Sequence, residues 1–189
     1  MCLRKRVPVV KMQKVIKYVV FKTNWGYFGL AGTEFALCRT HLPGPKPEKI
    51  KSLLLKNLPS PNKNSSIEFD TTFFKTIQEQ IIAYFEGAGI NFSLDIPIAL
   101  DGFSGFSIAV LTACRNIRFG QTITYAGLAK RADRSAASRA VGNALAKNPL
   151  PLIIPCHRVL RTDGKLGGFS APGGENLKKR LLSHEKHAS

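Results

Sequence analysis

The sequence predicts an α+β protein, with a first part that mixes strands and helices and a second part that is mainly helical. Two observations carry this prediction. Residues 16–40 contain strand-like apolar stretches around turn residues, whereas residues 104–147 carry apolar side chains at helical spacing. A length of 189 residues and a hydrophobic content of 44% are sufficient to bury a core.

The first predicted element is a β-hairpin over residues 16–40. Its strand-like stretches are Val19, Phe21 and residues 31–37, which are rich in apolar side chains. The Thr-Asn-Trp-Gly sequence of residues 23–26 marks the turn.

Two loops and one helix are predicted to follow the hairpin. Proline and glycine dominate residues 43–47, and residues 59–66 are polar, so both segments are interpreted as loops. Residues 73–85 carry apolar side chains at helical spacing and are followed by Gly87, which favours a helix that ends at this glycine.

A linker is predicted over residues 88–103, with an extended stretch around residues 92–98. We place the domain boundary near residues 91–101. The boundary divides the chain into an N-terminal α/β domain, residues 1–95, and a C-terminal domain, residues 96–189.

A helix-turn-helix is the main feature predicted in the second part. Residues 124–131 form a short helix with Thr124 as its N-cap, and residues 132–134 make a tight connection. Residues 135–147 form the next helix, which Asn148 closes before a proline. Two short helices joined by a short turn are typical of this motif.

Three further elements complete the second part. A helix over residues 104–117 precedes the helix-turn-helix, and a final helix begins at residues 177–182. The apolar run of residues 152–154 is interpreted as a buried strand.

The Pro-Cys-His-Arg-Val sequence at residues 155–159 carries the most chemistry in the chain. A thiolate is a nucleophile, and basic neighbours lower the pKa of a thiol. Proline fixes one backbone dihedral and removes a donor, so we expect the strand to end here and to present Cys156. Most single cysteines are small buried hydrophobes, however. Neighbouring side chains on an extended segment also point to opposite faces, so the sequence alone does not place His157 against Cys156.

The charge of the chain favours a polyanionic partner. The formal net charge is +16, and residues 102–150 carry seven Lys/Arg against one acid, Asp133. Such an excess attracts nucleic acid. Charge alone is also compatible with a basic protein that binds none, but here it lies beside a predicted helix-turn-helix.

The four cysteines are sparse and widely spaced, unlike a disulfide framework, which favours a reducing compartment. Cys38 and His41 lie close in sequence, but nothing nearby completes the roughly four ligands that zinc requires, so no metal is expected. No apolar run approaches the ~20 residues of a membrane span, and no signal peptide is recognised, so we expect a cytoplasmic protein without membrane contact.

Several motifs of the chain resemble those of the O6-alkylguanine-DNA alkyltransferases, also called methylated-DNA–protein-cysteine methyltransferases. The resemblance covers residues 104–185, and a weaker one covers residues 25–30 and 37–40. It implies a ribonuclease H-like N-terminal domain and a winged-helix-like C-terminal domain. The motifs that carry it are Asn148-Pro149-Leu150-Pro151-Leu152-Ile153-Ile154-Pro155-Cys156-His157-Arg158-Val159, Gly120-Gln121-Thr122-Ile123-Thr124-Tyr125, Arg139-Ala140-Val141-Gly142-Asn143, Gly167-Gly168-Phe169-Ser170 and Leu181-Leu182-Ser183-His184-Glu185.

The resemblance also implies the roles of individual residues. Cys156 is the nucleophile, His157 the base and Glu185 the group that orients it, while Tyr125 assists departure of guanine. Arg139 enters the duplex in place of the extruded base, and Asn148 is the hinge between the DNA-binding helix and the active-site strand. The remaining residues implied to contact DNA or substrate are Ser138, Ala140, Gly142, Arg158, Phe169 and Ser170. Phe169 stands where many members have tyrosine.

The implied reaction is one irreversible transfer of an alkyl group from O6-alkylguanine in double-stranded DNA to Cys156, without a cofactor. O4-alkylthymine is a second substrate to consider. We expect a monomer, located in the nucleus if the cell is eukaryotic. A non-catalytic lesion-binding protein of the alkyltransferase-like class is the leading alternative, and the presence of Cys156 argues against it. A Cys-His-Glu hydrolase is a second alternative, for which a helix-turn-helix has no use.

Overall fold

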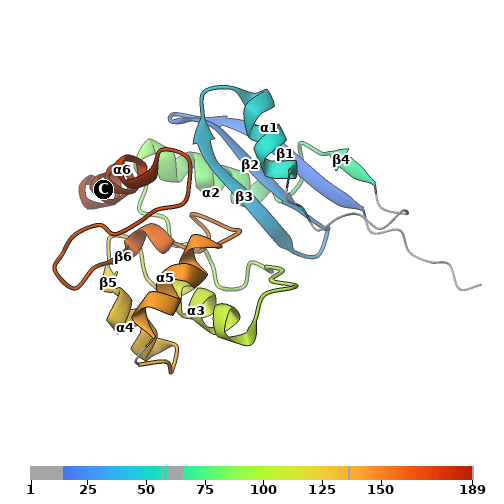
Figure 1. Ribbon diagram of the computed structural model, residues 1–189. Helices are drawn as coiled ribbons and strands as arrows, with labels where there is room; N and C mark the ends of the chain where they lie inside the picture. The colour runs from blue at the N-terminus through green and yellow to red at the C-terminus, as the bar shows by residue number, and fades with distance from the viewer. Residues whose placement is uncertain (1–14, 57, 59–65, 136, 189) are drawn as a thin grey trace, which may run out of the picture.

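A mixed sheet and a group of helices form the two parts of the protein, as the computed structural model shows in Figure 1. The structure describes residues 15–56, 58, 66–135 and 137–188. We call the segment from β1 to α2 the N-terminal part and the segment from α3 to α6 the C-terminal part. The α+β prediction is confirmed.

The N-terminal sheet has four strands in the order β3-β2-β1-β4. β1 (Ile16–Thr23) and β2 (Gly26–Gly32) form the predicted hairpin, in which Thr23 pairs with Gly26 across the turn. β3 (Leu37–Gly44) pairs antiparallel with β2, and β4 (Ile67–Phe69) pairs parallel with β1. The prediction of one strand over residues 31–37 was wrong, because the chain turns at residues 33–36 before β3 begins.

Two helices cover this sheet. α1 (Pro47–Leu55) packs on β2 and β3 and was not predicted. Proline at the first helical position is favourable there, because this residue needs no hydrogen-bond donor. α2 (Lys75–Glu86) packs on β1 and begins two residues later than predicted, because Phe74 has a left-handed backbone with φ 50°. Gly87 ends α2 as predicted.

The C-terminal part contains four helices in the described chain: α3 (Gly105–Arg115), α4 (Tyr125–Arg131), α5 (Ser138–Ala146) and α6 (Gly174–His187). The predicted cap of α4 is confirmed, because the Thr124 hydroxyl accepts a hydrogen bond from the Gly127 amide at 3.0 Å. α5 begins three residues later than predicted. Asp133, with φ 55°, reverses the chain, so the connection between α4 and α5 is longer than three residues.

The apolar run at residues 152–154 is buried, but it is not a strand. Leu152 has φ 80°, and the Ile154 amide donates to the Leu150 carbonyl at 2.8 Å, so the run forms a tight turn. A short 3-10 helix (Cys156–Arg158) follows, and then β6 (Val159–Leu160), which pairs parallel with β5 (Ile123–Thr124).

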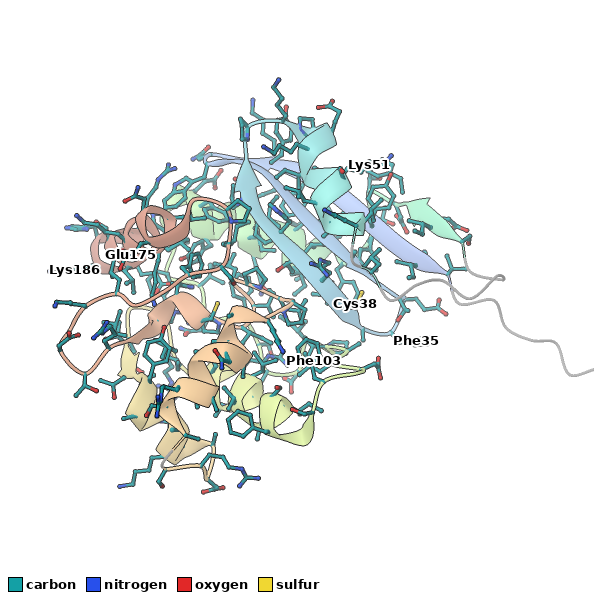
Figure 2. All side chains as sticks on the ribbon, in the orientation of Figure 1. Phe35, Cys38, Lys51, Phe103, Glu175 and Lys186 are labelled. Carbon is teal, nitrogen blue, oxygen red and sulfur yellow. The ribbon has the colours of Figure 1, made fainter. Side chains whose placement is uncertain are left out.

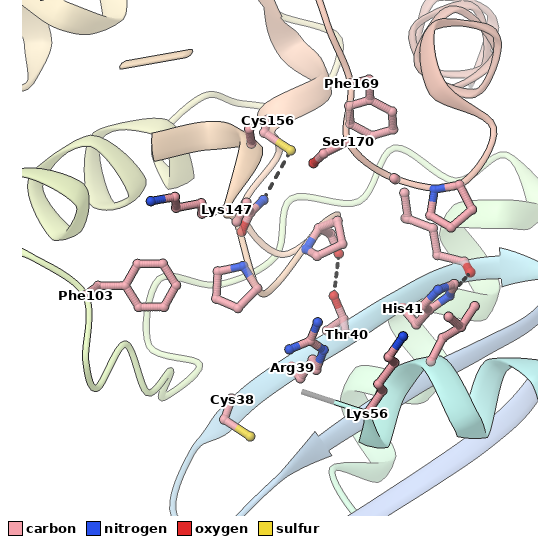
Figure 3. A pocket seen from close by; sticks show the side chains of 18 of the residues that line it. Cys38, Arg39, Thr40, His41, Lys56, Phe103, Lys147, Cys156, Phe169 and Ser170 are labelled. Carbon is pink, nitrogen blue, oxygen red and sulfur yellow. Dashed lines mark hydrogen bonds between the residues drawn. The ribbon is translucent and has the colours of Figure 1, made fainter. Parts of the chain in front are cut away.

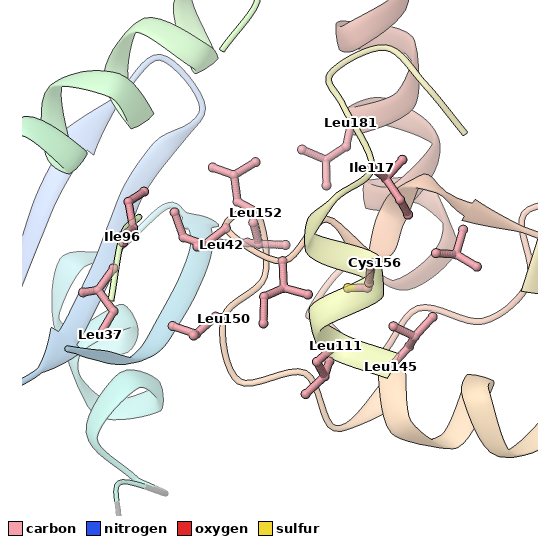
Figure 4. Close-up of a cluster of buried hydrophobic side chains, with 14 of the residues drawn as sticks. Leu37, Leu42, Ile96, Leu111, Ile117, Leu145, Leu150, Leu152, Cys156 and Leu181 are labelled. Atoms are coloured by element: carbon pink, nitrogen blue, oxygen red, sulfur yellow. The ribbon is translucent and has the colours of Figure 1, made fainter. Parts of the chain in front are cut away.

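One hydrophobic cluster runs through both parts (Figure 4). It joins Leu37, Leu42 and Ile96 to Leu150 and Leu152 of the turn. The segment between α2 and α3 also lies along β3, because the Leu37 amide donates to Pro97 and the Leu37 carbonyl accepts from Ala99. The division at residue 95 therefore stays a prediction. Among the described residues, no helix is both long and apolar enough to cross a bilayer.

Candidate functional site

Cys156 is the first residue of the 3-10 helix and lies at the end of a cavity of about 650 Å³ between the two parts (Figure 3). It is 8% exposed. The Asn148 side-chain amide donates to its sulfur at 3.2 Å and to the Ile154 carbonyl at 2.8 Å. The Asn148 side-chain oxygen accepts from the Leu150 amide at 3.0 Å. Asn148 thus ties the end of α5, the tight turn and the thiol together.

Burial raises the pKa of the Cys156 thiol, although the Asn148 amide and the positive charge of Lys178 lower it in part. The thiol is therefore protonated in the resting protein, and a base must remove its proton before the sulfur can act as a nucleophile.

His157 and Glu185 form a buried pair beside this cysteine. The distance from His157 Nε2 to Glu185 Oε1 is 2.7 Å, and both side chains are at most 2% exposed. Burial lowers the pKa of His157, so its imidazole is neutral at pH 7. Because Nε2 donates to the carboxylate, the lone pair lies on Nδ1. The His157 imidazole pairs with Glu185, whereas its backbone amide is the group that interacts with the Cys156 thiol and lowers the pKa of that thiol in part.

Glu185 accepts hydrogen bonds from three segments of the chain. Arg158 donates to Oε1 from Nη2 at 2.8 Å and to Oε2 from Nε at 2.9 Å. The Gly120 amide donates to Oε2 at 3.1 Å, and the Tyr84 hydroxyl donates to Oε1 at 2.8 Å. Burial raises the pKa of Glu185, but the hydrogen bonds from His157 and Arg158 outweigh it and lower the pKa to about 2.

The resemblance implied that Arg158 contacts DNA or substrate, but Arg158 does not line the cavity next to Cys156. It is 3% exposed, and its Nη1 donates to the Ile117 carbonyl at 2.6 Å. Its contacts are structural. A buried arginine needs such partners, because a buried unpaired charge is costly.

Tyr125 lies at the start of α4 and is half-buried, which raises the pKa of its hydroxyl. Gly167 packs on its ring: a Cβ at Gly167 would lie 3.0 Å from Tyr125 ring atoms, and the φ of 68° also requires glycine. A Cβ at Gly142 would meet the same ring at 3.7 Å. The fully buried Lys178 lies 5.7 Å from the ring centre and donates to the carbonyls of Val159 and Leu166.

Phe169 and Ser170 line the cavity together with Cys156 and Asn148 (Figure 3). The opposite wall comes from β3 and includes Thr40, whose hydroxyl donates to the Pro151 carbonyl at 2.7 Å. The structure thus brings four residues predicted from the sequence together at one cavity: Cys156, Asn148, Phe169 and Ser170.

Arg139 lies outside this cavity, on the exposed side of α5. Arg139 and Ala140 are exposed, whereas Val141, Ala144 and Leu145 on the other side of the helix are buried. Ser138, Arg139 and Tyr125 line a separate surface hollow of about 450 Å³. α5 therefore presents small side chains and one long cation outward.

Cys38 and His41, the two possible metal ligands close in sequence, each contact a backbone carbonyl. The Cys38 thiol donates to the Ala31 carbonyl at 3.5 Å, and a His41 ring nitrogen contacts the Leu42 carbonyl at 2.8 Å. Figure 2 shows Cys38 on β3. Among the described residues, no three His, Cys, Asp or Glu side chains gather as a metal site.

Tyr84, Gly120 and Lys178 were not predicted to be site residues. Tyr84 is 101 residues from Glu185, and its position in the helical pattern of α2 indicated only a core residue. Lys178 was expected on the surface of the final helix, because lysine side chains are almost never fully buried. A backbone amide such as that of Gly120 leaves no signal in the sequence.

Fold and site together define a class of protein: an α+β chain in which a cysteine, followed by a buried His–Glu pair, lies next to a helix-turn-helix. The family model of the 6-O-methylguanine DNA methyltransferase DNA-binding domain matches residues 105–187.

Curated relatives agree. The methylated-DNA–protein-cysteine methyltransferase of Methanosarcina acetivorans is 34% identical over 169 residues, which are 89% of this chain and 97% of the relative. That of Methanothermobacter thermautotrophicus is 40% identical over 111 residues, which are 59% of this chain and only 60% of the relative.

A solved structure agrees as well. Mycobacterium tuberculosis OGT, crystallised in complex with DNA, has a TM-score of 0.68 and 30% identity, covering 90% of this chain and 92% of that one. The chain belongs to the O6-methylguanine DNA methyltransferase family, and its C-terminal part is a DNA-binding domain.

Proposed function

We propose that this protein repairs DNA by transferring the alkyl group of O6-alkylguanine to its own Cys156. The observation that carries the proposal is the Cys156 thiol, which Asn148 holds at the end of a cavity of about 650 Å³. The name of the curated relatives, methylated-DNA–protein-cysteine methyltransferase, supports this reaction.

His157 is the base in this mechanism. With Nε2 bonded to Glu185, Nδ1 takes the thiol proton, through one water as the family resemblance implies. Because burial raises the pKa of Cys156, the thiolate forms only as the reaction begins. Glu185 remains ionised and stabilises the imidazolium that results.

The thiolate then attacks the alkyl carbon in line with its bond to O6. The S–C bond forms as the C–O6 bond breaks, and the electron pair of that bond passes to guanine. The Tyr125 hydroxyl, which burial keeps protonated, assists the departing base as a hydrogen-bond donor. Thiol exchange does not reverse a thioether, so each molecule acts once and needs no cofactor.

The exposed side of α5 is the DNA-contacting surface in this proposal. Small side chains at Ser138 and Ala140 permit close approach to a minor groove, and Arg139 fills the gap left by the extruded base. Extrusion is necessary because O6 lies in the paired edge of guanine, and it costs a few kcal/mol.

The extruded base is bound by the loop before α6. Phe169 supplies an apolar wall, and Ser170 offers its backbone amide to O6. Gly167 and Gly142 leave room for Tyr125 at the same site. We propose a monomer that acts on double-stranded DNA in a reducing compartment, the cytoplasm or, in a eukaryotic cell, the nucleus.

Mass spectrometry after incubation with an O6-methylguanine duplex tests the proposal. One methyl group should appear, on the peptide that contains Cys156. The Cys156→Ala variant should bind the duplex without removing the methyl group, whereas Cys114→Ala, which changes another buried thiol, should react normally. Demethylation by Cys156→Ala would overturn the assignment, and binding without any mass gain would favour a non-catalytic lesion-binding protein.

A further inference from the structure

One hydroxyl group of the N-terminal part reaches the buried carboxylate of Glu185. Tyr84, on α2, is fully buried, and its Oη donates to Glu185 Oε1 at 2.8 Å. The other donors to this carboxylate, His157, Arg158 and the Gly120 amide, all come from the C-terminal part. Among the described residues, Tyr84 is therefore the only hydrogen-bond donor of the N-terminal part that reaches the His157–Glu185 pair.

The donors fix the rotation of the carboxylate. Oε1 accepts from His157 at 2.7 Å, from Arg158 Nη2 at 2.8 Å and from Tyr84 at 2.8 Å. Oε2 accepts from Arg158 Nε at 2.9 Å and from Gly120 at 3.1 Å. Arg158 donates to both oxygens, whereas Gly120 donates only to Oε2. Tyr84 and His157 donate only to Oε1, so the Tyr84 hydroxyl favours the rotation that keeps Oε1 against His157.

Packing holds the tyrosine ring in place. Its ring meets Phe85 edge-on at 5.0 Å and Phe119 edge-on at 5.8 Å. The Tyr84 carbonyl is bonded to His184 Nε2, one residue before Glu185, and the His184 ring lies 5.0 Å from Trp25 of the β1–β2 turn. α6 is thus fastened to the N-terminal part directly beside Glu185.

We propose that Tyr84 is a positioning residue for alkyl transfer, whose hydroxyl holds Glu185 Oε1 against His157. This inference rests on the proposed function. It gives the N-terminal part a role in the reaction that requires no contact with DNA. Tyr84 acts through Glu185 and His157. It is not among the residues that line the cavity next to Cys156.

The hydroxyl also affects the charge that His157 experiences. The groups next to the His157–Glu185 pair are Arg158 on the 3-10 helix, Tyr84 on α2, Lys178 on α6 and the Gly120 amide. A hydroxyl that donates to Oε1 disperses the negative charge of the carboxylate. Removing it concentrates that charge beside His157, favours the imidazolium and so makes the base available only at higher pH.

The decisive experiment compares Tyr84→Phe with Tyr18→Phe in single-turnover methyl transfer from O6-methylguanine DNA across a range of pH. Tyr18 is the matched control, because it is a buried tyrosine of the same sheet-and-helix part, 7% exposed, and its hydroxyl donates to no described residue. Tyr84→Phe should react about three- to tenfold more slowly, and the acidic limb of its rate profile should move to higher pH. Tyr18→Phe should match the wild type in both respects.

The outcomes separate this inference from the proposed function. A wild-type protein that never gains a methyl group on Cys156 would overturn the function itself. A reactive wild type together with an unchanged pH profile in Tyr84→Phe would overturn only the positioning role, even if the variant is less stable. If Tyr84→Phe does not fold, 3-fluorotyrosine at position 84 decides, because a stronger donor should move the acidic limb to lower pH, and an unmoved limb would contradict the inference.

Discussion

Asn148→Ala is the substitution whose effect the structure predicts most directly. The side chain makes three hydrogen bonds: to the Cys156 sulfur at 3.2 Å, to the Ile154 carbonyl at 2.8 Å and from the Leu150 amide at 3.0 Å. Leu150 and Ile154 are both 0% exposed, so water cannot replace the lost partner.

The magnitude follows from the groups left unpaired. Each buried backbone group without a partner costs about 1–3 kcal/mol, so the two together should lower the free energy of unfolding by about 2–6 kcal/mol. The sulfur also loses a donor that stabilises its thiolate. Because the Asn148 amide lowers the pKa of Cys156, its removal should raise that pKa further and slow alkylation at neutral pH.

Urea unfolding measures the first effect, and the pH dependence of iodoacetamide labelling of Cys156 measures the second. Asn176→Ala is the matched control, because Asn176 is exposed on α6 and its side chain makes no hydrogen bond in the described part of the chain. If Asn148→Ala lost less than about 1 kcal/mol and its labelling profile matched that of the control, the reasoning from the three bonds would be refuted.

Three further predictions concern DNA and acid. Arg139→Ala should slow repair of duplex DNA far more than reaction with free O6-benzylguanine, which needs no extrusion; equal slowing in single-turnover assays of both would contradict the role of Arg139. Affinity for undamaged duplex should fall with salt, with a slope of roughly −0.9 per phosphate neutralised, and salt-independent binding in a titration would argue against the +16 charge as the main attraction. Glu185, whose pKa is lowered from 4.5 to about 2, stabilises the fold above its unfolded pKa, so about 3 kcal/mol should be lost as pH falls from about 4.5 to 2. Asp70 is partly exposed and titrates in the same pH range, so the Asp70→Asn variant removes its contribution. Urea unfolding of this variant should still show the loss of stability, and a stability that does not change with pH would contradict the prediction.

The local signals in the sequence predicted the C-terminal helices well. Thr124 caps α4 as predicted, because a side-chain cap acts over a few residues and leaves a readable pattern. The second helix, α5, ends at Ala146 with Lys147 as its C-cap, one residue before the predicted end. The helix α1 was missed because the prolines of residues 43–47 indicated a loop, whereas Pro47 is the first residue of the helix.

The error at residues 152–154 has a different cause. A run of three apolar residues indicates burial but not backbone conformation. Prolines at 149, 151 and 155 remove backbone donors that a strand would need, and Leu152 takes a left-handed conformation that no local pattern indicates.

The candidate site was predicted as far as its motif reaches. Cys156, His157 and Asn148 lie within ten residues of one another, and the resemblance added Glu185. Tyr84 was missed because its role depends on how α2 packs against α6, a contact between residues 101 apart. Contacts of this kind are set by the tertiary fold and not by sequence spacing.

The bond from Thr40 to Pro151 has a consequence for how the protein folds. It joins residues 111 apart, and together with the bond from the Thr40 amide to Pro149 it docks the tight turn that precedes Cys156 on β3. Contacts between residues so far apart in the chain form late in folding, because closing the long loop between them costs conformational entropy before the contact can offset it. A chain leaving the ribosome completes the sheet well before the turn is synthesised, so we expect the Cys156 sulfur to become buried, and protected from oxidants, only in the last stage of folding.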